Sequence, residues 1–180
     1  HLIESAGVRA SQVVRNLLGI ARKDKYEFLP IDLNETIVNA LSLVQHEIVE
    51  RNINVHTDLD PGIPMITASK DHLQGVWINL ILNAIDALQD ENGKVWISTR
   101  FLGSEFRVTV VDNGRGIPPD KLHKVFEPFY TTKVPGRGTG LGLSVSLRTI
   151  KQHGGTVSVE SHPGQGTKFT VALPKNNLTE

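Results

Sequence analysis

Apolar residues recur at intervals of three and four along several stretches of the sequence, which is the period of amphipathic helices. The first stretch covers residues 2 to about 22, where the apolar positions form the narrow seam of a helix packed lengthwise on another helix. The regular seam and the polar run of residues 22–25 favour a bundle helix, although an amphipathic helix lying on its own domain stays open. Further helices are predicted over 34–51, 70–89 and 141–153.

Alternating apolar and polar residues predict strands between and after these helices. The predicted strands are residues 53–59, 94–101, 106–112, 156–160 and 167–173. The last four form two hairpins, one turning at Gly103-Ser104 and the other at residues 163–166. A long glycine-rich connection joins the two hairpins, and a connection of this length is typically functional or disordered. Asp32 with Glu35 predicts a capping box for the second helix, and Ser69 is expected to cap the third.

The composition gives no positive indication of function, and it only excludes some classes of partner. The chain has 180 residues, with 19 Lys and Arg against 19 Asp and Glu, so its formal net charge is zero. Neutrality gives no general attraction to nucleic acid or to an anionic membrane, and we expect neither as a partner. The chain has no cysteine, which fits a reducing compartment, and no apolar run long enough to span a bilayer. We therefore expect a cytoplasmic chain, excised from a longer protein for which membrane anchoring stays open.

The third predicted helix carries polar residues on one narrow stripe, while apolar residues cover the rest of its circumference. The stripe consists of His72, Gly75, Asn79, Asn83, Asp86 and Asp90. Asn is a poor choice for a merely solvated stripe, because it lowers helix stability by roughly several tenths of a kcal/mol relative to Ala. Two neutral Asn oxygens four residues apart suit a hydrated divalent cation and the phosphates that it carries. Taken alone, the stripe is equally consistent with simple solvation or structural hydrogen bonding.

Three further motifs follow in order. Asp112-Asn113-Gly114-Arg115-Gly116-Ile117 ends an apolar strand, so its carboxylate can accept the exocyclic amine of adenine where glycines let the backbone approach. Residues 126–133 place aromatic side chains beside two hydroxyls and a lysine. Residues 136–143 alternate glycine with other residues directly before a helix, where exposed backbone N–H groups and the helix dipole suit polyphosphate. Each motif by itself also has an ordinary structural explanation, as a turn, an apolar loop contact or a flexible loop.

Together, in this order, the motifs resemble the Bergerat ATP-binding fold of sensor histidine kinases, type II topoisomerases, mismatch-repair ATPases and heat-shock chaperone ATPases. The resemblance covers about residues 32 to 174. Phe126-Glu127-Pro128-Phe129 and Gly140-Leu141-Gly142-Leu143 are similar to the corresponding boxes of the histidine kinases. Asn79 stands where the hydrolytic relatives carry a Glu, and Asn cannot activate water as a general base. The resemblance therefore favours a kinase.

The resemblance also implies roles for individual residues. Asn83 is implied as the magnesium ligand, Asp112 as the acceptor of the adenine amine, and Thr167 as a support for adenine through Asp112 or a water. The other implied nucleotide-binding residues are Asn79, Asp86, Gly114, Gly116, Ile117, Tyr130, Thr131, Thr132, Lys133, Gly138, Gly140, Leu141, Gly142 and Leu143. Asn79 and Lys133 are the candidate catalytic residues. The polar residues from Tyr130 to Lys133 are expected in the lid over the nucleotide.

The expected fold is an α/β two-layer sandwich, a mixed and mostly antiparallel sheet with three helices on one face. The implied cofactors are ATP and Mg²⁺, and the implied reaction is transfer of the γ-phosphoryl group to a histidine of the full-length dimer. The implied partners are a second copy of the chain, through the bundle helices, and the receiver domain of a response regulator. The alternatives are an ATPase or serine kinase of the same fold, and a non-catalytic module in which ATP binding gates dimer contacts.

The expected division assigns residues 1–29 to a bundle helix and linker, 30–175 to the ATP-binding catalytic domain and 176–180 to a tail. The phospho-accepting histidine is expected on a first bundle helix that this chain lacks, so the chain alone is not expected to autophosphorylate. His1 is not assigned as that acceptor. The other histidines, His46, His56, His72, His123, His153 and His162, are interpreted as surface or packing residues.

Overall fold

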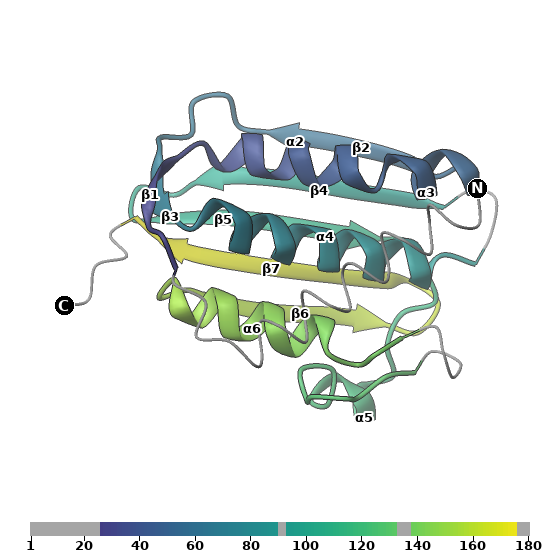
Figure 1. Ribbon diagram of the computed structural model, residues 1–180. Coiled ribbons are helices and arrows are strands. Elements are labelled where there is room, and N and C mark those ends of the chain that lie inside the picture. The colour runs from purple at the N-terminus through teal and green to yellow at the C-terminus, as the bar shows by residue number, and fades with distance from the viewer. Residues whose placement is uncertain (1–25, 90–92, 133–137, 176–180) are drawn as a thin grey trace.

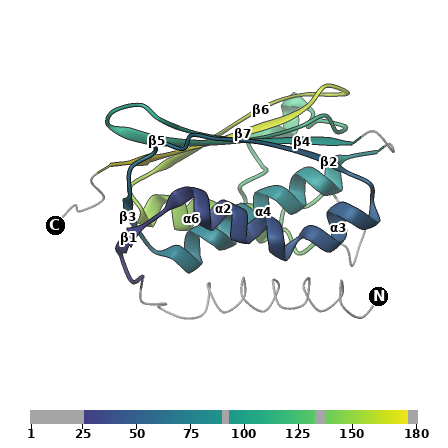
Figure 2. The same ribbon diagram turned by 90° about the horizontal axis from the view of Figure 1, so that it is seen from above.

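The computed structural model describes residues 26–89, 93–132 and 138–175. This part of the chain forms two layers, with helices covering one face of a five-stranded sheet (Figures 1 and 2). The helices are α2 (Leu33–Leu43), α3 (Gln45–Glu50), α4 (Lys70–Ala87), α5 (Pro119–Leu122) and α6 (Gly142–Gln152). The expected α/β two-layer sandwich is confirmed. The predicted helix over residues 2–22 lies outside the described residues.

The main sheet has the strand order β2-β4-β5-β7-β6, and a separate antiparallel pair is formed by β1 and β3. The strands are β1 (Leu29–Ile31), β2 (Asn54–Leu59), β3 (Ile66–Ala68), β4 (Lys94–Phe101), β5 (Glu105–Asp112), β6 (Thr156–His162) and β7 (Gly166–Pro174). β2 runs parallel to β4, because α4 crosses over between them, and the other neighbours in the sheet are antiparallel.

The central helix of the helical layer is α4, which packs between α2 and α6 (Figure 1). Its apolar residues are buried on most sides, as the sequence pattern predicts. Trp77 of α4 donates its indole N–H to Thr36 Oγ1 of α2 at 2.9 Å, and both side chains are buried. This bond satisfies the two polar atoms that the packing of α2 on α4 removes from water. None of the helices within the described ranges is long and apolar enough to cross a membrane.

Alternation along β5 and β7 positions two polar residues at the edge of the core. Phe106, Val108 and Val110 point from β5 into the core, and Asp112 is the next residue on that buried face. Thr167 continues the buried face of β7 in the same way, and it lies directly opposite Asp112 in the register of the two strands. The strand period therefore places a carboxylate and a hydroxyl side by side where the apolar core ends.

The observed elements differ from the predicted ones at a few places. The helix expected over 34–51 is interrupted at Val44, whose N–H bonds to Leu41 O at 3.1 Å in a tighter turn. Asp32 caps α2 as predicted, by accepting the N–H groups of Asn34 and Glu35. Ser69 stands at the predicted N-cap of α4, but its hydroxyl bonds His72 Nδ1 at 2.8 Å, and no side-chain capping bond is made. The strands β1 and β3 and the short α5 were not predicted.

Candidate nucleotide-binding site

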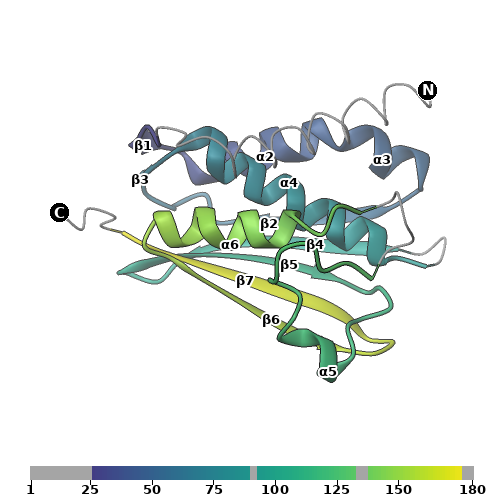
Figure 3. The ribbon, with the colours of Figure 1, turned by 60° about the horizontal axis from the view of Figure 1, so that its bottom comes forward.

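A cavity of about 630 Å³ opens between α4, the start of α6, α5 and the ends of β5 and β7. Figure 3 shows α4 and α6 side by side above the sheet, and α5 beside the end of β6. The cavity is lined by the predicted residues Asn79, Asn83, Asp86, Asp112, Gly116, Ile117, Tyr130, Thr131, Thr132, Gly138, Gly140, Gly142, Leu143 and Thr167. Segments distant in the sequence thus converge on one space whose volume is typical of a small-ligand pocket.

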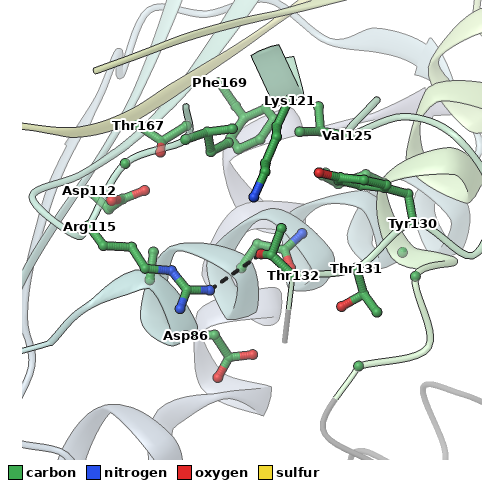
Figure 4. A pocket seen from close by; sticks show the side chains of 18 of the residues that line it. Asp86, Asp112, Arg115, Lys121, Val125, Tyr130, Thr131, Thr132, Thr167 and Phe169 are labelled. Carbon is green, nitrogen blue, oxygen red and sulfur yellow. Dashed lines mark hydrogen bonds between the residues drawn. The ribbon is translucent and has the colours of Figure 1, made fainter. Parts of the chain in front are cut away.

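Asp112 is the buried acid of this cavity (Figure 4), and its residue is only 3% exposed. Its Oδ1 accepts the backbone N–H of Gly114 at 2.8 Å, and the backbone N–H of Thr167 also hydrogen-bonds the carboxylate. Burial raises the pKa of Asp112 to about 6, against the opposing effect of these two N–H donors. At neutral pH the carboxylate is therefore mostly ionised, and it can accept a hydrogen bond from a ligand amine.

Behind Asp112 a hydroxyl network supports the cavity wall. Ser161 Oγ donates to Gly166 O at 2.7 Å and accepts the N–H of Ile117 at 2.8 Å. Because the single Ser161 proton is used on Gly166, Thr167 Oγ1 is the donor in its 3.0 Å bond to Ser161. The Thr167 hydroxyl proton thus points away from a ligand, and Thr167 supports Asp112 through its backbone N–H. Ser161 was not predicted from the sequence, although it lies on the buried side of β6.

Asn79 and Asn83 lie one turn apart on α4, but they have different surroundings. Asn79 is 7% exposed, and its Nδ2 lies 3.3 Å from both Gly142 O and Ser146 Oγ of α6. Its amide therefore joins α4 to the first two turns of α6. Asn83 lines the cavity, and its side-chain amide carries a neutral oxygen acceptor.

Two predicted residues lie behind the cavity and do not line it. Gly114 is buried, and its contribution is the N–H that holds Asp112. Leu141, at the N-cap of α6, is 2% exposed, so its side chain is buried and does not line the cavity. Lys133, and Arg137 in the glycine-rich stretch of residues 136–143, lie outside the described residues. The assignment of Lys133 therefore stays a prediction.

Asp86 contributes a second carboxylate to the cavity, and it is paired with a cation from another helix end. Arg51 Nη1 lies 3.5 Å from Asp86 Oδ1, and Arg51 Nη2 donates to Leu88 O at 3.4 Å. Arg51 follows α3 directly, so the pair links the end of α3 to the end of α4. The pair reduces the negative charge that Asp86 presents to a phosphate.

Further lining residues were not predicted from the sequence. They are Leu82, Ala87, Arg115, Pro118, Lys121, Val125, Thr139, Pro163 and Phe169. Phe169 could have been found, because it is the next inward residue after Thr167 in the alternation of β7. Lys121 and Val125 had no comparable signal, since they come from α5 and the turn after it. Phe169 and Val125 form an apolar wall near Asp112 that suits a flat aromatic base (Figure 4).

The residues before and after Tyr130–Thr139 contact each other through their backbones. Phe129 has φ of 66° and Gly140 has φ of 66°, both in the left-handed region. A Cβ atom at Gly140 would collide with the Phe129 backbone, so only glycine permits this approach. The Phe129 ring is 72% exposed beside this contact. The described residues on either side of positions 133–137 are therefore held together at the approach of Phe129 and Gly140.

The oxygen-bearing side chains of the cavity fit a Mg²⁺ ion carried by a polyphosphate better than they fit a metal ion held by protein ligands alone. Within the described ranges, no three His, Cys, Asp or Glu side chains gather where they could hold a metal ion. Asn83 is a lining residue with one amide oxygen, and Mg²⁺ typically takes one or two protein oxygens with substrate phosphates and waters as its other ligands. Asp112, the apolar wall and the glycine loop before α6 complete a site with separate regions for a base and for phosphates.

Residues 68–177 match the family model of histidine kinase-, DNA gyrase B- and HSP90-like ATPases. The sensor histidine kinase ZraS of Klebsiella oxytoca is 38% identical over 169 residues, which cover 93% of this chain and 36% of the relative. The chain thus spans about a third of the length of such curated relatives.

Solved structures show the same likeness. The nucleotide-free catalytic domain of histidine kinase ThkA has a TM-score of 0.75 and 35% identity, and the match covers 84% of this chain and 97% of that domain. Histidine kinase ThkA in complex with the response regulator TrrA has a TM-score of 0.80 and 29% identity, over 99% of this chain and 51% of the kinase.

Proposed function

We propose, since the chain belongs to the histidine kinase-, DNA gyrase B- and HSP90-like ATPase family as a sensor kinase catalytic domain, that it binds Mg-ATP. We propose further that it transfers the γ-phosphoryl group to a histidine of the full-length kinase dimer. A receiver-domain aspartate of a response regulator then takes the phosphoryl group from that histidine.

The environment of Asp112 is the observation that carries the proposal. A mostly ionised carboxylate, held by two backbone N–H groups at the end of a buried strand, is an acceptor for the exocyclic amine of adenine. Phe169 and Val125 offer apolar contacts to the base. Guanine presents a carbonyl oxygen where adenine presents its amine, so the carboxylate would repel it. The site thus favours ATP over GTP.

The other end of the cavity suits the phosphates. Gly138, Gly140 and Gly142 line it directly before α6, whose 11 residues direct the positive end of the helix dipole toward the cavity. Bound Mg²⁺ would neutralise phosphate charge and would take Asn83 as a protein ligand. Asn79 cannot act as a general base for water, and its amide already bonds α6. The γ-phosphoryl group is therefore left for an acceptor other than water.

The proposed transfer is a displacement at phosphorus. A histidine ring nitrogen attacks the γ-phosphorus, a P–N bond forms, and the bond to the β,γ-bridging oxygen breaks so that ADP leaves. The residues of the cavity contribute positioning and electrostatic stabilisation, which are the main sources of catalysis in phosphoryl transfer. Lys133 is proposed as a phosphate contact, on the family resemblance alone.

The proposed partners follow from the reaction. The acceptor histidine belongs to a dimeric helical bundle, so we propose a second copy of the full-length chain and a response regulator as partners. The relative ThkA forms a complex with a response regulator, which supports the second of these. A cytoplasmic setting is proposed because ATP and receiver domains are available there.

Calorimetric titration with ATP and GTP, with and without Mg²⁺, tests the binding step. Labelling of the full-length kinase from ATP carrying a labelled γ-phosphate tests the transfer step. Acid-labile labelling is expected, as for a phosphohistidine. Release of phosphate without labelling of the protein would instead favour an ATPase, and ATP binding without turnover would favour a module in which ATP only gates dimer contacts.

A further inference from the structure

The turn after β5 passes through a narrow gap between α4 and the β6–β7 hairpin. A Cβ atom at Gly114 would lie 2.5 Å from Ala87 O at the end of α4. Gly116 has φ of 70°, and a Cβ atom there would collide with His162 O at the end of β6. Only glycine fits at both positions. Arg115, between them, is the one residue of this narrow passage that carries a side chain.

The backbone of Arg115 is held from both sides of the gap. Its N–H donates to Ala87 O at 3.0 Å, and its carbonyl oxygen accepts the N–H of Gly164 at 2.9 Å. The guanidinium is exposed and extends over the mouth of the cavity, where Nη2 lies 3.5 Å from Thr132 Oγ1 (Figure 4). The hydrogen-bonded backbone of Arg115 therefore positions a solvent-accessible guanidinium at the proposed nucleotide site.

The backbone of Arg115 lies close to the proposed phosphate end of the site. Ala87, which accepts the Arg115 N–H, lies one helical turn beyond Asn83 on α4. One turn of an α-helix is about 5.4 Å, so Arg115 is anchored close to the proposed magnesium ligand. The other cation that lines the cavity within the described ranges is Lys121, whose chain starts beside Phe169 and Val125 and whose ammonium group extends into the cavity (Figure 4).

We propose that Arg115 is a specificity-determining residue that binds a phosphate group of the nucleotide and so makes affinity depend on the number of phosphates. The inference rests on the proposed binding of ATP. A guanidinium presents a planar fork of N–H donors that matches phosphate oxygens, and it keeps its charge at every physiological pH. Arg51 pairs with Asp86, which reduces the negative charge that this carboxylate contributes to the cavity.

The experiment is a calorimetric comparison of adenosine, AMP, ADP and ATP binding in the presence of Mg²⁺. In Arg115→Met, affinity for ADP and ATP should fall about ten- to a hundred-fold, while adenosine affinity should change less than about two-fold. Arg115→Lys should lie between Met and wild type, because it keeps the charge and loses the fork. Arg107→Met is the matched control, since Arg107 is an exposed β5 arginine that contacts Glu105.

The outcomes separate this inference from the proposed function. If wild type binds ATP and Arg115→Met binds it equally well, the inference is overturned while ATP binding stands. Equal losses for adenosine and ATP would place the side chain on the base or ribose, and would also overturn it. Wild type that fails to bind ATP would overturn both. Because Arg115 is exposed, thermal melting of both variants should match wild type, and this excludes misfolding as the cause.

Discussion

His153 Nε2 accepts the backbone N–H of Ser69 at 3.0 Å, and this bond joins the C-cap of α6 to the N-cap of α4. The other ring nitrogen, Nδ1, lies 2.8 Å from Thr149 O. An Nε2 that accepts requires Nδ1 to carry the proton, so the ring is neutral in this arrangement. Asn79 joins the same two helices at the cavity end. Both ends of α6 are therefore hydrogen-bonded to α4 or its N-cap.

His153→Ala should lower the free energy of unfolding by about 2 to 4 kcal/mol. The substitution leaves the buried Ser69 N–H without its acceptor and opens a cavity under Phe28, whose ring centroid lies 4.9 Å from that of His153. Denaturant unfolding measures the loss. His123→Ala, at an exposed histidine, is the control, and equal stability of the two variants would refute the structural role.

Acidification should weaken the fold through the same histidine. Burial lowers the pKa of His153 from 6.5, and the nearby His72 adds to this effect against the opposing Thr149 bond. The unfolded chain then binds the proton more tightly, so stability is full above about pH 6.5 and falls as the pH drops toward the folded pKa. Asp112, with a raised pKa, contributes in the opposite direction.

The difference in unfolding free energy between wild type and His153→Gln isolates this effect, because Asp112 titrates in both. The difference should shrink as the pH falls below about 6.5. A difference independent of pH would mean that the folded state binds the proton on His153 as well as the unfolded state does.

The layers of the fold could be predicted from the sequence because burial on one face imposes a period. β5 and β7 alternate apolar and polar residues, so both strands were located within one or two residues of their ends. β1 and β3 are three residues long, which is too short for a period, and Pro30 within β1 argues against a strand. Their pairing depends on contact between segments distant in the sequence.

Residues of the cavity could be predicted from the sequence where they belong to a motif. Residues that only the folding of the chain places in the cavity could not be predicted. Asp112 and the glycines before α6 were found from their chemistry and order. Ser161 and Lys121 were missed, because an isolated serine on a strand and a lysine on a one-turn helix carry no sequence signal. Thr167 lies directly opposite Asp112 and its backbone N–H hydrogen-bonds the carboxylate, while its expected role toward adenine stays a prediction.

Asn83→Ala should remove most of the magnesium dependence of ATP binding, if its oxygen is the metal ligand. Asn79→Ala should instead lower stability by about 1 to 2 kcal/mol, because its amide bonds α6. Magnesium titrations of ATP affinity and denaturant unfolding separate the two roles. Asn39→Ala on α2, away from the cavity, is the control. An unchanged magnesium titration in Asn83→Ala would contradict the assignment.

Asp112→Ala should reduce ATP affinity by about ten- to a hundred-fold, the usual effect of losing a hydrogen bond to a charged group. The affinity of wild type should also fall as the pH drops through about 6, since protonation removes the charge that accepts the adenine amine. The ratio of wild-type to Asp112→Asn affinity cancels the ionisation of ATP itself. A ratio that stays constant with pH would show that the Asp112 charge does not contribute to binding.

Two glycine substitutions should change stability in opposite directions. In Gly116→Ala the new Cβ would lie against His162 O, and the alanine would have to adopt a left-handed backbone conformation. The free energy of unfolding should therefore fall by more than about 2 kcal/mol, and ATP affinity should fall as well. In Gly75→Ala, in the interior of α4, the new Cβ would meet nothing within 4 Å, so the free energy of unfolding should rise by about 0.5 to 1 kcal/mol. Denaturant unfolding measures both changes. A loss in Gly75→Ala would imply that another segment of the protein packs closely against this face of α4.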